Sequence, residues 1–133
     1  MSKIERPRAE GLFHNPAYSQ VVVATGARTV FISGQVSVDA SGALVGEGDL
    51  AAQTTQAMRN LEVALASAGA TFADVVKITT YVVDYRPELR PIIGGARSPF
   101  FGSGAPPAST LVGVSALAAP EWLIEIEAIA VVG

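Results

Sequence analysis

The sequence predicts an α+β fold in which a single sheet carries helices on one side only. The first observation is the order of strand-like and helical stretches, β-β-α-β-α-β-β, which has too few helices to cover both faces of a sheet. The second is composition: 133 residues, half of them hydrophobic, can bury one core without disulfides. No linker or repeat divides the chain, so residues 1–133 are interpreted as one domain that begins with an irregular, turn-rich segment at residues 1–17.

The first two strands are predicted on either side of a short turn. Residues 21–24 and 29–35 are rich in Val, Ile and Phe and flank the turn at residues 25–27, which indicates a β-hairpin. A further short extended piece is expected near Leu44 and Val45.

The first helix is expected between Asp49 and about Ala68. The Asp49 carboxylate can accept hydrogen bonds from the free backbone N–H groups of the first turn, and Gly69 suits a left-handed C-terminal cap. Gln53 and Arg59 lie largely off the apolar stripe of this helix. The stripe recurs at helical spacing and consists of Leu50, Thr54, Ala57, Met58, Leu61 and Leu65.

The stretch at residues 87–101 is the second helical candidate. Pro91, Gly94, Gly95 and Pro99 each lower its helix propensity. This helix is therefore expected to be short or broken.

Three strands are predicted in the second half of the chain. Residues 75–83 are rich in β-branched side chains, and residues 106–115 and 123–131 are interpreted as two adjacent strands. Because side chains alternate along a strand, Glu125 and Glu127 share one face while the apolar residues around them share the core face. The charged face is where chemistry or a subunit contact is expected.

The face of the sheet without helices is expected to be buried against other copies of the chain. Apolar area on it would cost about 25 cal/mol per Å² if it were left in water. A small chain with this hydrophobic content commonly hides part of its surface in an oligomer. The apolar residues assigned to this face are Val75, Tyr81, Leu123, Ile129 and Val131.

Composition excludes several functions. A net charge of −3 with nine scattered basic residues argues against nucleic-acid binding. The single histidine, His14, cannot build a multi-histidine metal site, and without cysteine there is no thiolate ligand or nucleophile. No apolar run is long enough to span a bilayer and no signal segment opens the chain, so no membrane partner is expected. The absence of cysteine fits the expected cytoplasmic location.

Several motifs carry a resemblance when they are taken jointly and in order. They are Tyr18-Ser19-Gln20, Phe31-Ile32-Ser33-Gly34-Gln35, the Ala-rich helix, the strand from Val75 to Asp84, Pro107-Ala108, and Ile124-Glu125-Ile126-Glu127-Ala128. From about Gly11 to Val132, the chain resembles the Rid family (reactive intermediate deaminases), also called the YjgF or translation-inhibitor-type endoribonuclease family.

The resemblance implies a chorismate-mutase-like fold, with one mixed sheet and two helices on one face. It implies assembly as a homotrimer, with ligand clefts between neighbouring copies. It also implies small-molecule partners, namely unstable imines and enamines derived from amino acids. In family members that act on them, hydrolysis yields a 2-keto acid and ammonia without cofactor or metal, so neither is expected here.

The resemblance also implies the site residues. Active members grip the substrate carboxylate with an arginine directly after the Pro-Ala pair, because a planar guanidinium donates two parallel hydrogen bonds to a carboxylate. A glutamate at the position of Glu125 orients or deprotonates the attacking water, which makes Glu125 the catalytic candidate. The ligand-binding candidates are Tyr18, Ser33, Gly34, Ser109 and Thr110.

Ser109 stands where active relatives carry that arginine, so the charge-assisted clamp is missing. Losing it costs roughly a hundredfold or more in binding, which predicts weak or absent activity on the usual 2-imino acids. Leu111 stands where a cysteine is frequent and Gly94 where an asparagine is frequent. Arg90 and Arg97 are interpreted as surface charges, with the alternative that one of them reaches the cleft and replaces the clamp.

Other interpretations stay open. Glu125 could instead pair with Lys77 or an arginine, as buried carboxylates often do. His14 could be a solvated loop residue or could lie beside the cleft near Tyr18. The chain could also be a non-catalytic module that binds a metabolite or a partner protein, whereas a ribonuclease fits the acidic balance and the single histidine less well.

Overall fold

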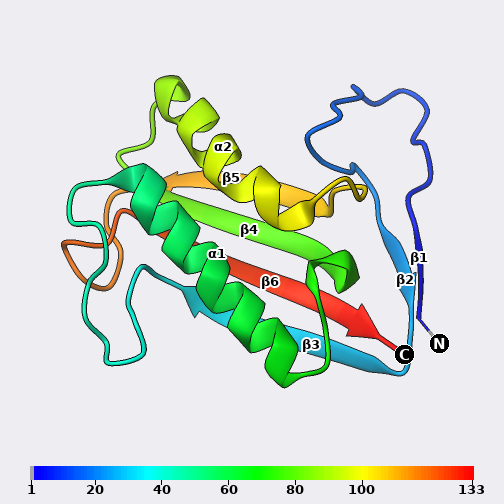
Figure 1. Cartoon of the computed structure of the whole chain (residues 1–133). Coiled ribbons are helices and arrows are strands. Elements are labelled where there is room, and N and C mark those ends of the chain that lie inside the picture. The colour runs from blue at the N-terminus through cyan, green and yellow to red at the C-terminus, as the bar shows by residue number, and fades with distance from the viewer. Residues whose placement is uncertain (1) are drawn as a thin grey trace.

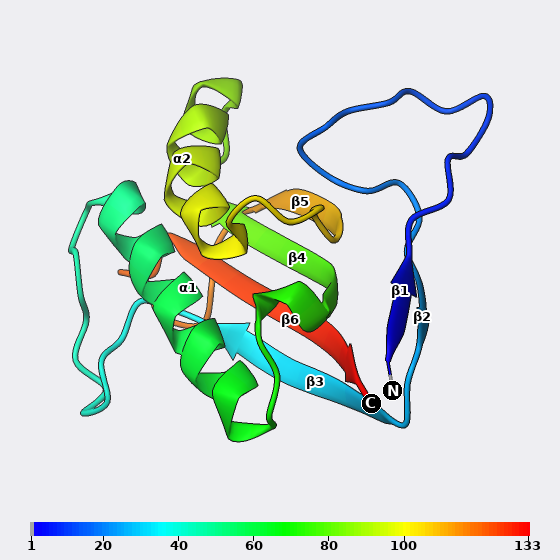
Figure 2. The same cartoon turned by 45° about the vertical axis from the view of Figure 1, so that its right-hand side comes forward.

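The computed structural model of the chain describes residues 2–133. Its main sheet consists of β3 (Arg28–Gln35), β4 (Val75–Val83), β5 (Ala108–Val114) and β6 (Ile124–Val132). These strands lie in the order β3-β6-β4-β5, in which β4 and β5 run parallel and the other neighbours run antiparallel. The two α-helices of residues 2–133 pack on the same face of this sheet, as Figures 1 and 2 show. The predicted α+β fold, with one mixed sheet and helices on one face, is confirmed.

The first helix, α1 (Leu50–Ser67), begins and ends close to the predicted positions. The Asp49 carboxylate accepts a hydrogen bond from the backbone N–H of Ala52 at 3.0 Å, which satisfies one free donor of the first turn. At the other end, Gly69 adopts a φ of +72°, a left-handed value that favours glycine. A short 3-10 helix, η1 (Phe72–Asp74), then leads into β4.

The second helix, α2 (Arg90–Phe101), follows the 3-10 helix η2 (Pro87–Leu89). It is shorter than the predicted stretch at residues 87–101, but it is continuous and not broken. Pro91 lies in the first turn, where a backbone N–H has no intrahelical acceptor in any case. Pro99 lies in the last turn, where its ring removes only one bond. Ile93 and the two phenylalanines at the end of the helix pack on the core, and this packing stabilises the helix.

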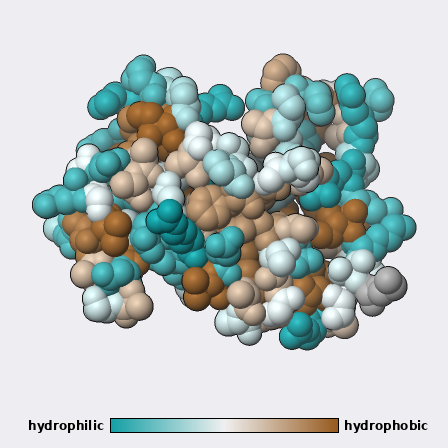
Figure 3. Space-filling view, viewed as in Figure 1, coloured by the Kyte–Doolittle hydropathy of each residue, from teal (hydrophilic) through white to brown (hydrophobic). Residues whose placement is uncertain are grey.

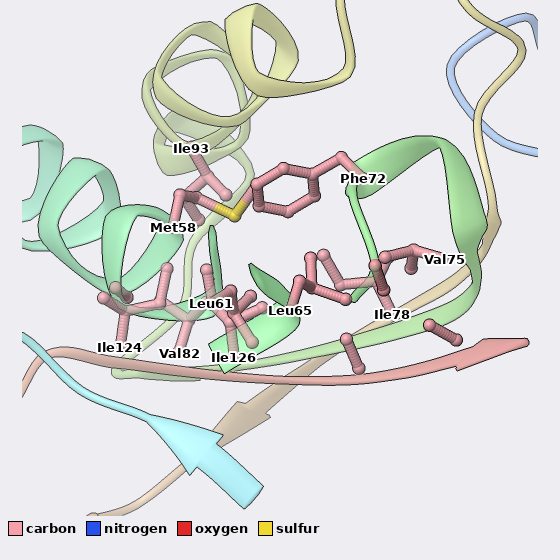
Figure 4. Close-up of a cluster of buried hydrophobic side chains, with 14 of the residues drawn as sticks. Met58, Leu61, Leu65, Phe72, Val75, Ile78, Val82, Ile93, Ile124 and Ile126 are labelled. Atoms are coloured by element: carbon pink, nitrogen blue, oxygen red, sulfur yellow. The ribbon is translucent and has the colours of Figure 1, made fainter. Parts of the chain in front are cut away.

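The hydrophobic core lies between the sheet and the two helices, as Figure 4 shows. The buried residues of β6 alternate with the half-buried Glu125 and Glu127, as the sequence predicted. The largest apolar side chains that are fully buried are Met58, Leu61, Leu65, Val75, Ile78, Val82, Ile93, Ile124 and Ile126.

The predicted N-terminal hairpin is wrong. Its first strand, β2 (Val23–Thr25), pairs with β1 (Lys3–Glu5), while β3 pairs with β6. Between β2 and β3 the chain crosses the end of β6 at Gly26, where a Cβ would lie 2.7 Å from the carbonyl oxygen of Val132. The segment at residues 1–17, which was expected to be irregular, therefore contains a strand.

Two details of the second half of the chain also differ from expectation. The strands β5 and β6 are not neighbours in the sheet, because β4 lies between them. Val75 was assigned to the face without helices but lies in the core at 1% exposure, since the pairing of β4 with β6 shifts register between Val75 and Lys77. Val131 is only 9% exposed on its face, because the chain crosses it at Gly26.

The face of the main sheet away from the helices, called the open face below, retains exposed apolar residues. Phe31 is 75% exposed there and stands opposite the half-buried Ile129, and Val112 is 37% exposed. On the helix side, by contrast, hydrophilic and hydrophobic residues are interspersed over the surface that Figure 3 shows. The open face thus carries apolar area that no element of residues 2–133 covers with a second layer.

Candidate functional site

Glu125 lies on the open face, near the start of β6. Its neighbours along the strand, Ile124 and Ile126, face the core, and Tyr81 of β4 stands opposite it in the register. The Glu125 side chain lies across the backbone of Gly34, so closely that a Cβ at position 34 would overlap the carboxylate. Glycine is therefore required at position 34 by the approach of Glu125.

The strand β3 bulges at Ser33 and Gly34. Between Ile32 and Gln35 the pairing advances by one residue more on β3 than on β6. Such an extra residue bends the strand and re-aims its neighbours, and it is common beside functional sites. The structure thus brings Gly34 and Glu125 together, with Ser33 beside them in the bulge.

Ser109 lies on the other face of the sheet, toward the helices. It stands opposite the buried Ile78 of β4, and side chains paired across two strands share a face. Ser109 lines two adjoining pockets, of about 300 Å³ and about 390 Å³, which we call the helix-side pockets. The other residues that line both pockets are Ala17, Gly94 and Arg97.

Arg97 reaches from α2 to the sheet at these pockets. Its Nη1 donates a hydrogen bond of 2.7 Å to Thr80 Oγ1, and Thr80 is fully buried on β4. The Arg97 Nε is buried without a hydrogen-bond partner among residues 2–133, and burial lowers the pKa of the guanidinium. The interpretation of Arg97 as a surface charge was wrong. The sequence did contain an indication that Arg97 is not a surface residue. Arg97 follows the buried Ile93 by four residues, so the two share one side of the helix.

The loop before β2 closes one side of the helix-side pockets. Tyr18 lines the larger pocket together with the exposed Arg90. The next residue, Ser19, donates its backbone N–H to the carbonyl oxygen of Pro107 at 3.0 Å, which holds this loop along the start of β5. His14 lines a different pocket, formed largely by the N-terminal segment, which Tyr18 also borders.

Thr110 does not share the helix-side pockets with Ser109. Adjacent residues of a strand point to opposite faces, and Lys77 Nζ donates to Thr110 Oγ1 at 2.7 Å on the open face. The ion pairs found among residues 2–133 lie in other segments, so Glu125 has no cationic partner within the described part of the chain.

Glu127 lies close enough to Tyr81 on the open face to affect the pKa of its phenol. A side-chain hydrogen bond with Glu127 is the main reason that the pKa of Tyr81 is raised, and the charge of Glu125 adds a smaller contribution in the same direction. Glu127 therefore interacts with a neighbouring strand of the same sheet.

No three His, Asp or Glu side chains of residues 2–133 gather closely enough to hold a metal ion. Within the same residues, no helix combines the length and the apolar character needed to cross a bilayer. The sequence contains no cysteine.

Fold and site together define a class of protein: a mixed-sheet α+β protein with pockets under α2 and a carboxylate over a strand bulge on the opposite face. The chain belongs to the Rid/YjgF family, since the family model described as Endoribonuclease L-PSP matches residues 12–132. A crystal structure of the Rid-family protein YyfB from Yersinia pestis, described as a protein of unknown function, matches with a TM-score of 0.92 at 42% identity. That match covers 97% of this chain and 98% of the YyfB chain.

Two relatives illustrate the range of names in the family. Protein DfrA of Myxococcus xanthus is 37% identical over 114 residues, which are 86% of this chain and 84% of DfrA. The 2-iminobutanoate/2-iminopropanoate deaminase of Bos taurus is 39% identical over 118 residues, which are 87% of this chain and 80% of that protein. The family resemblance stated from the sequence motifs is confirmed.

Proposed function

We propose that this chain forms a homotrimer that binds a small metabolite in clefts shared between neighbouring copies. There it hydrolyses an imine or enamine to a carbonyl compound and ammonia. The observation that carries this proposal is that Ser109 faces the helices whereas Glu125 faces away from them on the same sheet. One chain cannot present both residues to one ligand, but the helix side of one copy and the open face of the next can do so. The exposed Phe31 on the open face supports burial of that face against another copy.

The proposed reaction adds water across a C=N bond and then expels ammonia. Glu125 takes a proton from the attacking water as the new C–O bond forms and passes it to the imine nitrogen, which gives a neutral carbinolamine. Glu125 then transfers the proton of the carbinolamine hydroxyl to the nitrogen, the C–N bond breaks as the C=O bond forms, and ammonia leaves. Water and imine thus give carbonyl compound and ammonia, with no net gain or loss of protons or electrons. The acidic balance of the chain favours such a small substrate over RNA.

The test is turnover of an imine generated in the assay. 2-Aminoacrylate or 2-iminobutanoate is produced enzymatically, and release of the keto acid is followed with wild type, Glu125→Gln and the matched variant Glu127→Gln. We expect Glu125→Gln to lower the rate by about 10²- to 10⁴-fold and Glu127→Gln to stay near wild type. Light scattering on the same samples gives the number of copies in the assembly.

A non-catalytic binding module predicts a different result. Ligands would then raise the melting temperature without turnover of any imine in the panel, and Glu125→Gln would alter binding at most. Equal rates for wild type and Glu125→Gln would contradict the role of Glu125. Weak activity on 2-imino acids is expected because position 109 is a serine. That expectation holds only if no other arginine binds the substrate carboxylate in the cleft.

A further inference from the structure

Among residues 2–133, Arg97 forms no ion pair. Its Nη1 donates to the hydroxyl of Thr80 at 2.7 Å, while its buried Nε donates to nothing within residues 2–133. In the part of the chain that the structure describes, no Asp or Glu lines either of the helix-side pockets. Withdrawing a guanidinium from water without a counter-ion is unfavourable, and the lowered pKa of Arg97 has the same cause. The site is therefore electrostatically incomplete within one chain.

Small residues leave space beside this guanidinium. Ser109 and Gly94 line both helix-side pockets with Arg97, and a Cβ built on Gly94 meets no atom within 4 Å. The larger pocket, of about 390 Å³, has the size of a site for a small molecule. Tyr18 supplies a phenol at the same pocket. The pockets thus combine one unpaired positive charge, room for a ligand and a few polar groups.

We propose that Arg97 is the anion-binding residue of this cleft, and that the ligand carries a planar carboxylate next to the reacting carbon. The guanidinium is suited to donating two parallel hydrogen bonds to such a group. The identity of the reacting carbon rests on the proposed function, whereas the carboxylate contact stands on the pockets alone. The charged contact to the carboxylate then comes from Arg97 on α2. It does not come from position 109 on β5, which is a serine in this chain. With that contact present, the reason to expect weak activity on 2-imino acids disappears.

A purely structural role for Arg97 makes a different prediction. Arg97 would then only tie α2 to β4 through Thr80, and a neutral side chain would replace it without changing ligand affinity. A second alternative is that Glu125 of a neighbouring copy is the permanent counter-ion of Arg97. In that case the guanidinium would be occupied before any ligand arrives.

The test relocates the arginine. Binding of pyruvate, a stable 2-keto acid, is measured by calorimetry with wild type, Arg97→Ser, Ser109→Arg and the double variant Arg97→Ser/Ser109→Arg. Arg59→Met is the control, since Arg59 is exposed on α1 and lines none of these pockets. Pyruvamide, which has the same shape without the charge, is the control ligand. Circular dichroism and thermal unfolding check that each variant is folded.

We expect wild type to bind pyruvate in preference to pyruvamide, and Arg97→Ser to lose about tenfold to a hundredfold in pyruvate affinity. The double variant should regain most of that loss, because a guanidinium at position 109 points into the same pockets. Arg59→Met should bind like wild type. Failure of wild type to prefer pyruvate, or unchanged affinity in a folded Arg97→Ser, would overturn the proposal.

If Arg97→Ser does not fold, NMR on the wild-type protein tests the same proposal. The Nε–Hε NMR signal of Arg97, assigned from its disappearance in Arg97→Lys, should shift when pyruvate is added to the wild-type protein. A signal that ignores pyruvate but moves in Glu125→Gln would overturn the proposal in favour of the permanent counter-ion. Turnover and binding separate the two proposals. Pyruvate binding through Arg97 without imine hydrolysis would refute the proposed function alone, and hydrolysis that survives Arg97→Ser unchanged would refute this inference alone.

Discussion

The side-chain carbonyl oxygen of Gln53 accepts a hydrogen bond of 2.9 Å from the backbone N–H of Leu123, at the entrance to β6. The amide nitrogen of the same side chain donates to the carbonyl oxygens of Gly46 and Glu121, both at 3.1 Å. The fully buried side chain of Gln53 thus connects α1 to the loops at Gly46 and Glu121 and to the start of β6, the strand that carries Glu125.

Gln53→Met should lower the free energy of unfolding by roughly 2 kcal/mol or more, since it removes the side-chain partner of the Leu123 N–H and the Glu121 carbonyl and one of the two donors to the Gly46 carbonyl. Urea unfolding measures the change. The matched variant is Gln56→Met, because Gln56 lies on the same helix and its side chain, among the described residues, bonds only to the side chain of Asn60. It should cost about 0.5 kcal/mol. Similar costs for the two variants would show that the bonds of Gln53 carry no special weight.

Phe31 offers a direct test of assembly through the open face. Phe31→Ser should shift the assembly toward smaller species on dilution, because burial of this side chain contributes about 1.5–3 kcal/mol. Light scattering over a concentration series measures the shift. Phe13 is a fitting control, since both phenylalanines are 75% exposed but Phe13 lies outside the main sheet. If Phe31→Ser leaves the assembly intact, the open face is not the contact.

Alanine substitutions at the neighbouring Gly94 and Gly95 of α2 can distinguish an effect on stability from an effect on ligand binding. A Cβ at Gly94 or at Gly95 meets no atom within 4 Å, so each Gly→Ala change should stabilise the protein by about 0.5–1 kcal/mol. Only Gly94 lines the helix-side pockets, so only Gly94→Ala should also change pyruvate affinity. Thermal unfolding and calorimetry on both variants provide the comparison, and an equal effect on affinity would argue against these pockets as the site.

The pKa of Tyr81 reports on the carboxylates of the open face. Its ordinary value of 10.0 is raised chiefly by the hydrogen bond with Glu127 and least by the charge of Glu125. Absorbance titration of the phenol should therefore show a larger fall of the pKa in Glu127→Gln than in Glu125→Gln. The reverse order would mean that Tyr81 faces Glu125.

The same shift has a consequence for stability. The folded protein holds the Tyr81 proton more tightly than the unfolded chain, so this contribution is present below the unfolded pKa of about 10. It is lost as the pH rises through the higher folded value. Wild type should therefore lose stability relative to Tyr81→Phe above about pH 10, which denaturant unfolding at several pH values measures.

Local chemistry made part of this fold predictable. The alternation along β6, the cap at Asp49 and the left-handed Gly69 each depend on a few consecutive residues, and all agree with the structure. The placement of Glu125 away from the core followed from the same alternation. These features are decided within one turn or one strand, where sequence carries the information.

Partners that are distant in sequence were harder to predict. A local pattern cannot show that β2 pairs with β1 and that β3 pairs with β6, because both contacts join segments far apart in the chain. Gln53 and Arg97 were misjudged for a related reason. A polar residue next to an apolar stripe is usually solvated. Only the tertiary structure shows that Gln53 forms hydrogen bonds with three backbone groups of distant loops, and that Arg97 donates to Thr80.

The placement of Ser109 and Glu125 on opposite faces of one sheet also bears on genetics. If each cleft joins the helix side of one chain to the open face of another, every chain contributes to two clefts and completes neither. Arg97→Ser and Glu125→Gln chains, each impaired alone, should then show higher activity when they are co-expressed, because some clefts receive an intact Arg97 from one chain and an intact Glu125 from the other. Activity assays on co-purified mixtures of the two variants would show such complementation. The smallest active unit of this protein would then be an interface between two chains.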